Sequence, residues 1–115
     1  MSISILHNPR CSKSRQTLQL LQEKGIEPEV IEYLKTPPSA VELKSIITKL
    51  GIDTRDLFRK KEAEYKETGA NDESLTEQQL LDIMVATPKL IERPIVINGD
   101  KAVIGRPPEN VLDII

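Results

Sequence analysis

The two ends of the chain carry the patterns that most constrain its fold. Residues 2–6 alternate polar and apolar as a half-buried strand does, residues 12–24 have helical periodicity, and residues 28–33 form a second strand-like run. Two strands joined by a helix over so short a stretch predict a βαβ unit with parallel strands. Near the other end, Asn98-Gly99 separates two short apolar runs, which predicts a tight hairpin whose turn needs positive φ values.

The middle of the chain is predicted to be helical. Two capping-box patterns, a Ser or Thr with Glu or Gln three residues later, begin at Ser39 and Thr76. Each precedes apolar residues at helical spacing. We expect the first of these helices to end at Gly51 and the second to end before Pro88.

Three further helical segments are predicted. A short helix is expected over 54–58, an exposed helix or turn over 60–68, and a last helix over 109–115. A βαβ half and a ββα half on either side of a helical insertion predict an α/β, thioredoxin-like fold around a mixed four-stranded sheet. A chain of 115 residues suits one domain, which we expect to span 1–115.

Composition excludes several classes of protein. With one cysteine, an internal disulfide and a cysteine-based zinc cluster are impossible, so we expect no metal and a reducing, cytoplasmic location. No apolar run approaches the roughly 20 residues of a membrane span, and no signal peptide is evident. The net charge is −2 and no basic block exists, so we expect neither nucleic acid nor membrane as a partner.

The single cysteine, Cys11, lies in a basic segment. The first acidic residue is Glu23, and nearby positive charge lowers the pKa of a thiol toward the nucleophilic thiolate. Cys11 also precedes a predicted helix, whose N-terminus offers free N–H groups. Polar neighbours argue against an apolar core position, so we expect a reactive cysteine rather than a small buried hydrophobe. The basic residues close to it in the sequence are His7, Arg10, Lys13 and Arg15.

Three arginines lie at the ends of predicted elements, at Arg59, Arg93 and Arg106. Each alone is more often a solvated surface residue. If they converge on Cys11, they would offset the repulsion between a thiolate and an anionic substrate, which at about 4 Å is about 1 kcal/mol in water and about 4 kcal/mol at an effective dielectric of about 20. The planar guanidinium also binds two oxygens at once.

Other nearby residues allow two interpretations each. His7 is either a strand-end residue bonded to backbone or a group that stabilises the thiolate or moves a proton. Ser12 and Ser14 are either helix caps or donors to the sulfur or an oxyanion. Pro94 either starts an edge strand or is the cis-proline expected at this place in a thioredoxin-like fold, packed against the cysteine.

Two motifs are absent. The fourth position of a Cys-x-x-Cys motif holds Ser14, so a resolving thiol must come from outside, for which glutathione or a glutaredoxin is the best candidate. The arginine position of a Cys-x5-Arg loop holds Thr17, which argues against a low-molecular-weight phosphatase.

The run from His7 to Arg15, His-Asn-Pro-Arg-Cys-Ser-Lys-Ser-Arg, resembles the active-site loop of the glutaredoxin-coupled arsenate reductases. These form the ArsC family of the thioredoxin-like superfamily, related to the Spx regulators. Residues 32–38, 57–60, 93–96 and 105–107 also keep the family's order and spacing.

The resemblance implies an arsenate reductase. Cys11 would attack arsenate to form a thiol–arsenate adduct, which glutathione and glutaredoxin would resolve to release arsenite. Glutathione would be a co-substrate, with no bound cofactor. By position, Arg59, Arg93 and Arg106 match the oxyanion-binding arginines of the family.

Further matches concern the loop around the cysteine. His7 matches the residue that favours the thiolate, and Ser14 and Arg15 match residues that support the loop. Arg10 departs from the family, in which a small residue often stands there.

Two alternatives remain open from the sequence. A glutathione-dependent reductase of another substrate would not need three cations for a neutral disulfide. An Spx-like regulator that binds RNA polymerase would typically carry Cys-x-x-Cys as a redox switch, whereas this chain has Ser14 in the second position.

Overall fold

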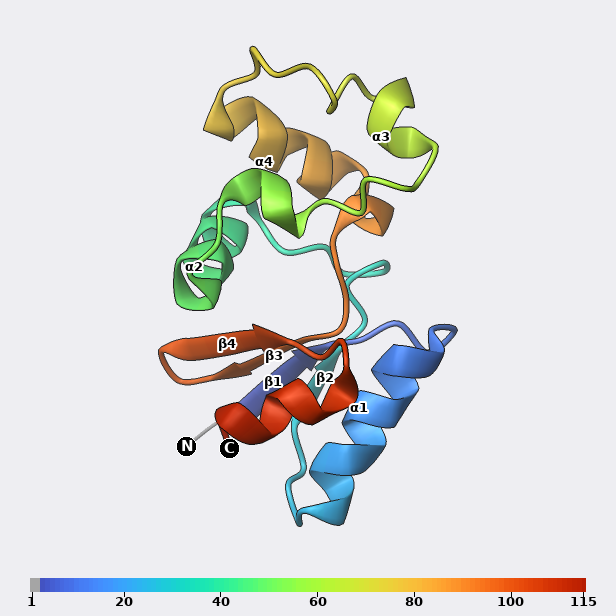
Figure 1. Cartoon of the computed structure of the whole chain (residues 1–115), viewed down its shortest axis with the longest axis vertical. Helices are drawn as coiled ribbons and strands as arrows, with labels where there is room; N and C mark the ends of the chain where they lie inside the picture. The colour runs from blue at the N-terminus through green and yellow to red at the C-terminus, as the bar shows by residue number, and fades with distance from the viewer. Residues whose placement is uncertain (1–2) are drawn as a thin grey trace. The chain divides into compact units, whose positions relative to one another are not determined.

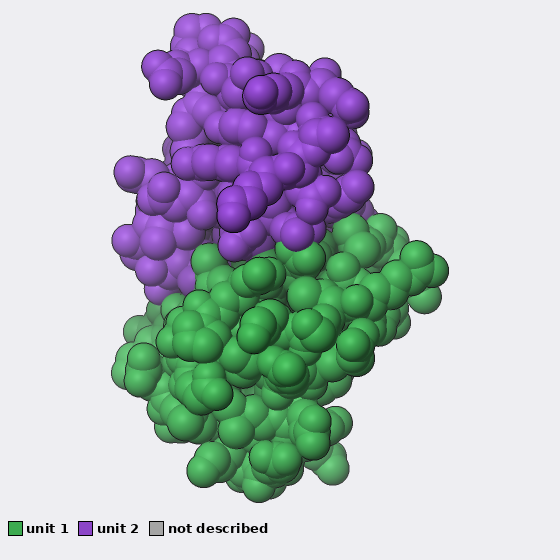
Figure 2. All heavy atoms as spheres, turned by 45° about the vertical axis from the view of Figure 1, so that its right-hand side comes forward, with its two compact units in different colours: residues 1–36, 93–115 green, residues 37–92 purple. Residues whose placement is uncertain are grey.

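The computed structural model describes residues 3–115, which divide into two compact units (Figure 2). Unit 1 comprises the N-terminal segment up to Thr36 together with residues 93–115. Unit 2 comprises residues 37–92, the region of the predicted helical insertion. The single domain expected over 1–115 stays a prediction.

Unit 1 contains a four-stranded sheet in the order β2-β1-β3-β4. β1 pairs parallel with β2 and antiparallel with β3, and β3 pairs antiparallel with β4, so the sheet is mixed as predicted. Ser2, placed in the first strand by its pattern, lies outside the described residues. The strands are β1 (Ile3–Leu6), β2 (Glu29–Ile31), β3 (Ile95–Asn98) and β4 (Lys101–Ile104).

Two helices pack side by side on one face of this sheet (Figure 1). They are α1 (Ser12–Glu23) and the 3₁₀ helix η3 (Pro108–Asp113). Alternation along the strands turns Ile5 of β1 and Val96 of β3 toward them, and the two residues are direct cross-strand partners. With Leu21 of α1 and Val111 of η3, they form a fully buried aliphatic cluster.

The hairpin between β3 and β4 differs from the prediction in its turn. Asn98 pairs with Lys101 inside the ladder, so the two-residue loop is Gly99-Asp100. Gly99 has φ +63°, whereas no non-glycine residue in the described part of the chain has a positive φ. A positive φ at the first loop position alone fits a type II′ turn. Asn98 instead remains in the strand, and its side-chain amide donates to the carbonyl of Ile114.

The C-terminal helix also differs from its prediction. It begins at Pro108 and ends at Asp113 as a 3₁₀ helix, rather than spanning 109–115. Short helical segments near a chain turn often take this tighter form. The Asn110 side chain donates to the carbonyls of Ile104 and Arg106, which ties the start of η3 to the end of β4.

Unit 2 is helical, and both predicted capping boxes are present. The Ser39 hydroxyl accepts a hydrogen bond from the Glu42 N–H, and Thr76 does the same for Gln79. Gly51, with φ +70°, ends the first helix as expected. The elements are α2 (Ala40–Leu50), η1 (Thr54–Leu57), α3 (Glu64–Glu67), α4 (Glu77–Ala86) and η2 (Pro88–Leu90).

The predicted apolar faces of unit 2 form its core. α2 and α4 pack on each other, and the segment over 60–68 is a turn followed by the short α3, none of whose residues is buried. Among residues 3–115, no helix has the length and apolar character that crossing a membrane requires. The buried residues of α2 and α4 are Leu43, Ile46, Ile47, Leu80, Leu81 and Met84.

Candidate functional site

Asn8 organises the loop that leads from β1 to the cysteine. Its N–H donates to Ser14 Oγ at 3.0 Å, and its side-chain Oδ1 accepts from the Arg10 N–H at 3.0 Å. Its carbonyl accepts from the Cys11 N–H at 3.0 Å. Three polar groups of one residue therefore shape the loop, a role that its sequence signature as a turn residue did not reveal.

Cys11 is the N-cap of α1, as expected from its place between a strand and a helix. Its backbone is extended (φ −96°, ψ 124°), and only 9% of the residue is exposed. Burial alone would raise the pKa of the thiol. The backbone N–H groups of Ser14 and Lys13 and the charges of Arg93 and Arg106 outweigh it, so the pKa lies below its ordinary value.

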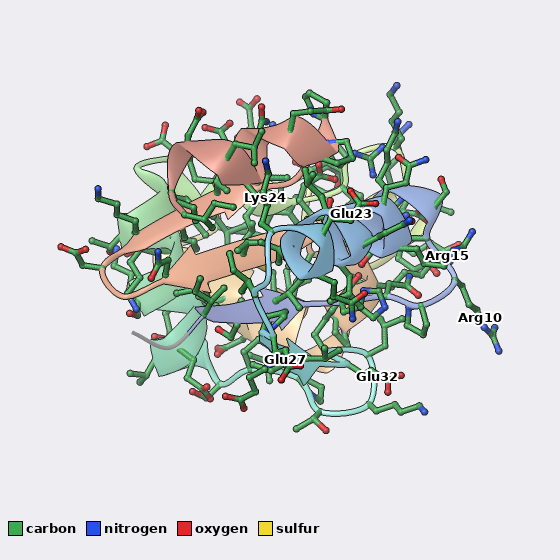
Figure 3. The ribbon with its side chains drawn as sticks, turned by 90° about the horizontal axis from the view of Figure 1, so that it is seen from below. Arg10, Arg15, Glu23, Lys24, Glu27 and Glu32 are labelled. Atoms are coloured by element: carbon green, nitrogen blue, oxygen red, sulfur yellow. The ribbon has the colours of Figure 1, made fainter. Side chains whose placement is uncertain are left out.

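Although Cys11 is buried, its surroundings differ from those of a cysteine in an apolar core. The groups that shift its pKa are backbone N–H donors and guanidinium groups, which favour the thiolate. The basic residues that follow or precede Cys11 in the sequence do not act on the thiol through their side-chain charges, as the sequence had suggested. Arg10 points away from the protein (Figure 3), and Lys13 contributes its backbone N–H. Arg15 donates to the Pro9 carbonyl at 2.8 Å, which supports the loop.

His7 bonds to Ser14 through its ring. The distance from His7 Nδ1 to Ser14 Oγ is 2.6 Å, and both residues are buried. Because the Ser14 hydroxyl already accepts from the Asn8 N–H, its own hydrogen is available for Nδ1. Burial lowers the pKa of His7, the Glu32 carboxylate opposes this, and Arg15 adds to it. The lowered pKa favours the neutral ring, whose Nδ1 accepts the Ser14 hydrogen in the tautomer that carries the ring hydrogen on Nε2.

The helix-cap interpretation of Ser14 is wrong. α1 has no side-chain cap, because Cys11 occupies the N-cap position, and the Ser14 hydroxyl is directed to His7 and Asn8. The interpretation of His7 as a residue bonded to backbone holds only for its backbone N–H, which donates to the Ile31 carbonyl. Ser12 is exposed on the first turn of α1.

Two of the three arginines reach Cys11 electrostatically from the last strands of the sheet. The Arg93–Pro94 peptide bond is cis, the form expected for this proline. The Gly105 N–H donates to the Pro94 carbonyl at 2.9 Å, which joins the residue before Arg106 to the residue after Arg93. The charges of both arginines lower the pKa of the Cys11 thiol.

Arg93 carries unsatisfied hydrogen-bond donors. Its Nε and Nη1 atoms are buried and have no partner among residues 3–115. Buried N–H donors without acceptors are costly, and an anion is the group that would satisfy them. Arg93 can thus bind an oxyanion close to a thiol that favours its thiolate form.

Arg59 belongs to unit 2. Its Nη1 lies 3.0 Å from a Glu62 carboxylate oxygen, and its Nε lies 3.7 Å from Glu92. Its side chain is 22% exposed. Its approach to Cys11 stays a prediction.

Comparison with known proteins places the chain in a family. A model of the ArsC family matches residues 6–114. The chain belongs to the ArsC family. Arsenate reductase of Haemophilus influenzae is 52% identical over 116 residues, which covers 100% of both chains. The uncharacterized protein YfgD of Escherichia coli K12 is 54% identical over 114 residues, covering 98% of this chain and 96% of its own.

A solved structure of the ArsC family shows the same fold. Arsenate reductase from Vibrio cholerae superposes with a TM-score of 0.97 at 51% sequence identity, covering 100% of this chain and 98% of its own. The thioredoxin-like α/β prediction and the family resemblance drawn from residues 7–15 are therefore confirmed.

Sequence reasoning missed the structural roles of three residues around the candidate site, Asn8, Thr17 and Gly105. Asn8 holds the loop, and the buried Thr17 contacts Gly105 across the molecule's first and last segments. The sequence offered a hint for Gly105, because it directly precedes Arg106, one of the arginines predicted to bind the oxyanion. The sequence offered no hint for Thr17, because its partner is 88 positions away.

Proposed function

We propose that this protein is an arsenate reductase. The observation that carries the proposal is the pair of buried, unsatisfied N–H donors of Arg93, whose charge also helps to lower the pKa of the Cys11 thiol. Relatives about 50% identical along the whole chain bear the name arsenate reductase, which supports arsenate as the oxyanion.

The first step is attack by the Cys11 thiolate on arsenic. Arg93 and Arg106 bind the arsenate oxygens and offset the repulsion between two anions, which is about 4 kcal/mol at about 4 Å and an effective dielectric of about 20. The proposed contribution of Arg59 is a third guanidinium. The backbone N–H groups at the start of α1 stabilise the thiolate before attack.

The atoms of this step balance as a substitution. A bond forms between Sγ and arsenic, an As–O bond breaks, and the oxygen leaves as hydroxide or, after protonation, as water. Arsenic remains As(V) in the thiol–arsenate adduct. Neutral His7 holds Ser14 and the loop in place, and it contributes no positive charge to this step.

Resolution needs two electrons from external thiols. Cys11 is the only cysteine in the chain, so no internal disulfide can form. We propose that the glutathione thiol displaces a second oxygen from arsenic as water, forming an As–S bond. A glutaredoxin thiol then attacks the glutathione sulfur, so that the two thiols become one mixed disulfide and the electron pair of the broken As–S bond reduces As(V) to As(III). Water hydrolyses the remaining bond between Sγ and arsenic, which releases arsenite and regenerates the Cys11 thiol.

The test is arsenate-dependent NADPH consumption with glutathione, glutaredoxin and glutathione reductase, together with direct detection of arsenite. We expect turnover in the wild type and none in Cys11→Ser, which removes the nucleophile while keeping nearly the same shape. An inactive but folded wild type, or turnover that persists in Cys11→Ser, contradicts the proposal.

Two matched arginine variants test the oxyanion site in the same assay. Arg93→Lys keeps the charge but loses the two-pronged donor set, so we expect kcat/KM to fall by about 10- to 100-fold. Arg10→Lys makes the same change on a side chain that points into solvent, and its rate should match the wild type (Figure 3). Equal rates in both variants would make Arg93 a structural residue.

A further inference from the structure

Thr17 connects the cysteine helix to the segment that carries Arg106. The residue is fully buried on α1, the helix that Cys11 caps. Its Oγ1 lies 2.8 Å from the Lys13 carbonyl and 3.3 Å from the Gly105 carbonyl. A threonine inside a helix often donates to the carbonyl four residues earlier. That local hydrogen bond does not explain the contact with the Gly105 carbonyl, which comes from the other end of the chain.

Gly105 fits this contact because it lacks a side chain. A Cβ at this position would lie 2.7 Å from Thr17 Oγ1 and 2.9 Å from Thr17 Cγ2. It would also lie 3.0 Å from Pro94 Cγ. The backbone conformation of Gly105 does not require glycine, so the requirement is one of space.

The consequence concerns the distance between a charge and the thiol. Cys11 begins α1, and Arg106 follows Gly105 directly, so the close contact of Thr17 with Gly105 determines how near the Arg106 backbone comes to that helix. The Coulomb energy of a guanidinium and a thiolate varies inversely with their separation. A small displacement at Gly105 therefore changes how strongly Arg106 acts on Cys11.

We propose that Thr17 and Gly105 are positioning residues that set Arg106 against Cys11 and so strengthen the local positive charge at the sulfur. The inference rests on the proposed function for the roles of Arg106 and Cys11. Neither Thr17 nor Gly105 touches the substrate. Other groups that act on the sulfur are Arg93 and the backbone N–H groups of Ser14 and Lys13. The nearby His7 ring is bonded to the Ser14 hydroxyl and does not act on the sulfur directly.

The experiment compares alkylation of Cys11 by neutral iodoacetamide and anionic iodoacetate at the same pH. Both reagents react with the same thiolate, so the ratio of their rates cancels the thiolate fraction and reports the charge around the sulfur. Thr17→Val keeps the shape and loses the hydroxyl, whereas Thr17→Ser keeps the hydroxyl. We expect the iodoacetate-to-iodoacetamide ratio to fall about three- to tenfold in Thr17→Val and to stay near wild type in Thr17→Ser.

A second variant and a double mutant make the test independent of folding defects in Thr17→Val. Gly105→Ala displaces the same contact from the other side and should lower the ratio similarly. In an Arg106→Gln background, Thr17→Val should change the ratio no further, because the charge on which it acts is gone. An equal drop in that background, or unchanged ratios in Thr17→Val and Gly105→Ala, would overturn the proposal.

Failure of the inference is distinguishable from failure of the proposed function, because alkylation needs neither arsenate nor glutathione. A normal ratio in Thr17→Val with active arsenate turnover overturns the positioning role alone. A wild-type ratio in Arg106→Gln removes Arg106 from the surroundings of the thiol, and it contradicts both the inference and the proposed oxyanion role of that arginine.

Discussion

The charges that matter to Cys11 come from residues distant in the chain rather than from its neighbours. Lys13 acts on the thiol through its backbone N–H, and the Arg15 guanidinium donates to the Pro9 carbonyl, although both residues follow Cys11 closely in the chain. Arg93 and Arg106 arrive instead at the ends of paired strands. The sequence around Cys11 correctly predicted a basic environment for the thiol, but the positive charges that act on it come from Arg93 and Arg106 rather than from its neighbours.

At the same scale, His7 predicts a pH effect. Its folded pKa lies below the ordinary value of 6.5, so the unfolded chain takes up a proton at a higher pH than the folded protein does. The stability that neutral His7 contributes is therefore present above about pH 6.5 and is lost as the pH falls. We expect the free energy of unfolding of the wild type to decline between about pH 7 and about pH 5 more steeply than that of His7→Gln.

Urea unfolding at steps of pH measures this difference. Ser14→Ala provides the matched comparison, since it removes the partner of Nδ1 but leaves the titrating ring in place. In Ser14→Ala, the free energy of unfolding should still decline as the pH falls, but less steeply than in the wild type. Identical slopes in the wild type and His7→Gln would show that His7 titrates as it does in the unfolded chain.

At the scale of elements, the segments that bring each group into the site were largely predictable. Apolar spacing, two capping boxes and helix-ending glycines are local, and they gave the helices and strands close to their observed bounds. The prediction of a turn at Asn98-Gly99 was wrong by one position, because strand pairing determines which residues form the loop. Arg59 illustrates the same limit, since the spacing of three residues to Glu62 is a local signal for an ion pair but nothing local indicated the ion pair with Glu92.

Those ion pairs lead to a prediction about the proposed role of Arg59. Glu62 occupies Nη1, a terminal donor that a bound oxyanion would need, and its other oxygen lies 3.4 Å from Lys89. Glu62→Gln frees the guanidinium, so we expect the KM for arsenate to fall about two- to fivefold with little change in kcat. Glu77→Gln, which loses a carboxylate paired with Lys44, is the matched control and should leave KM unchanged.

Steady-state kinetics in buffer free of phosphate and sulfate measure both constants. A raised KM in Glu62→Gln would mean that Glu62 orients Arg59 instead of competing for it. Equal changes in Glu62→Gln and Glu77→Gln would mean that overall charge, rather than this ion pair, is responsible.

At the scale of the whole molecule, stability and reactivity are linked through Cys11. The folded protein holds the pKa of this thiol below its ordinary value, because N–H donors and two guanidinium groups outweigh burial. A depressed pKa adds stability that is fully present above the unfolded pKa and is lost as the pH falls through the folded one. The thiolate thus contributes to folding in the alkaline part of this window.

We therefore expect the wild type to gain stability relative to Cys11→Ser as the pH rises toward about pH 9. Chemical unfolding of both proteins under reducing conditions measures the difference, and its rise should begin near the pKa obtained from Cys11 alkylation and level off near the pKa of the unfolded thiol. A difference that is constant with pH would show that folding leaves the pKa of the thiol unaltered.

The sequence alone determined the strands and helices, the mixed sheet, the place of Cys11 between a strand and a helix, and the resemblance to the ArsC family, because each depends on local periodicity or on motifs of adjacent residues. The tertiary structure alone decided that Arg93 keeps unsatisfied donors, that Ser14 serves His7 rather than the helix end, and that Thr17 meets Gly105. These contacts join segments far apart in the chain. Their energies depend on distances that only the packed sheet and helices establish.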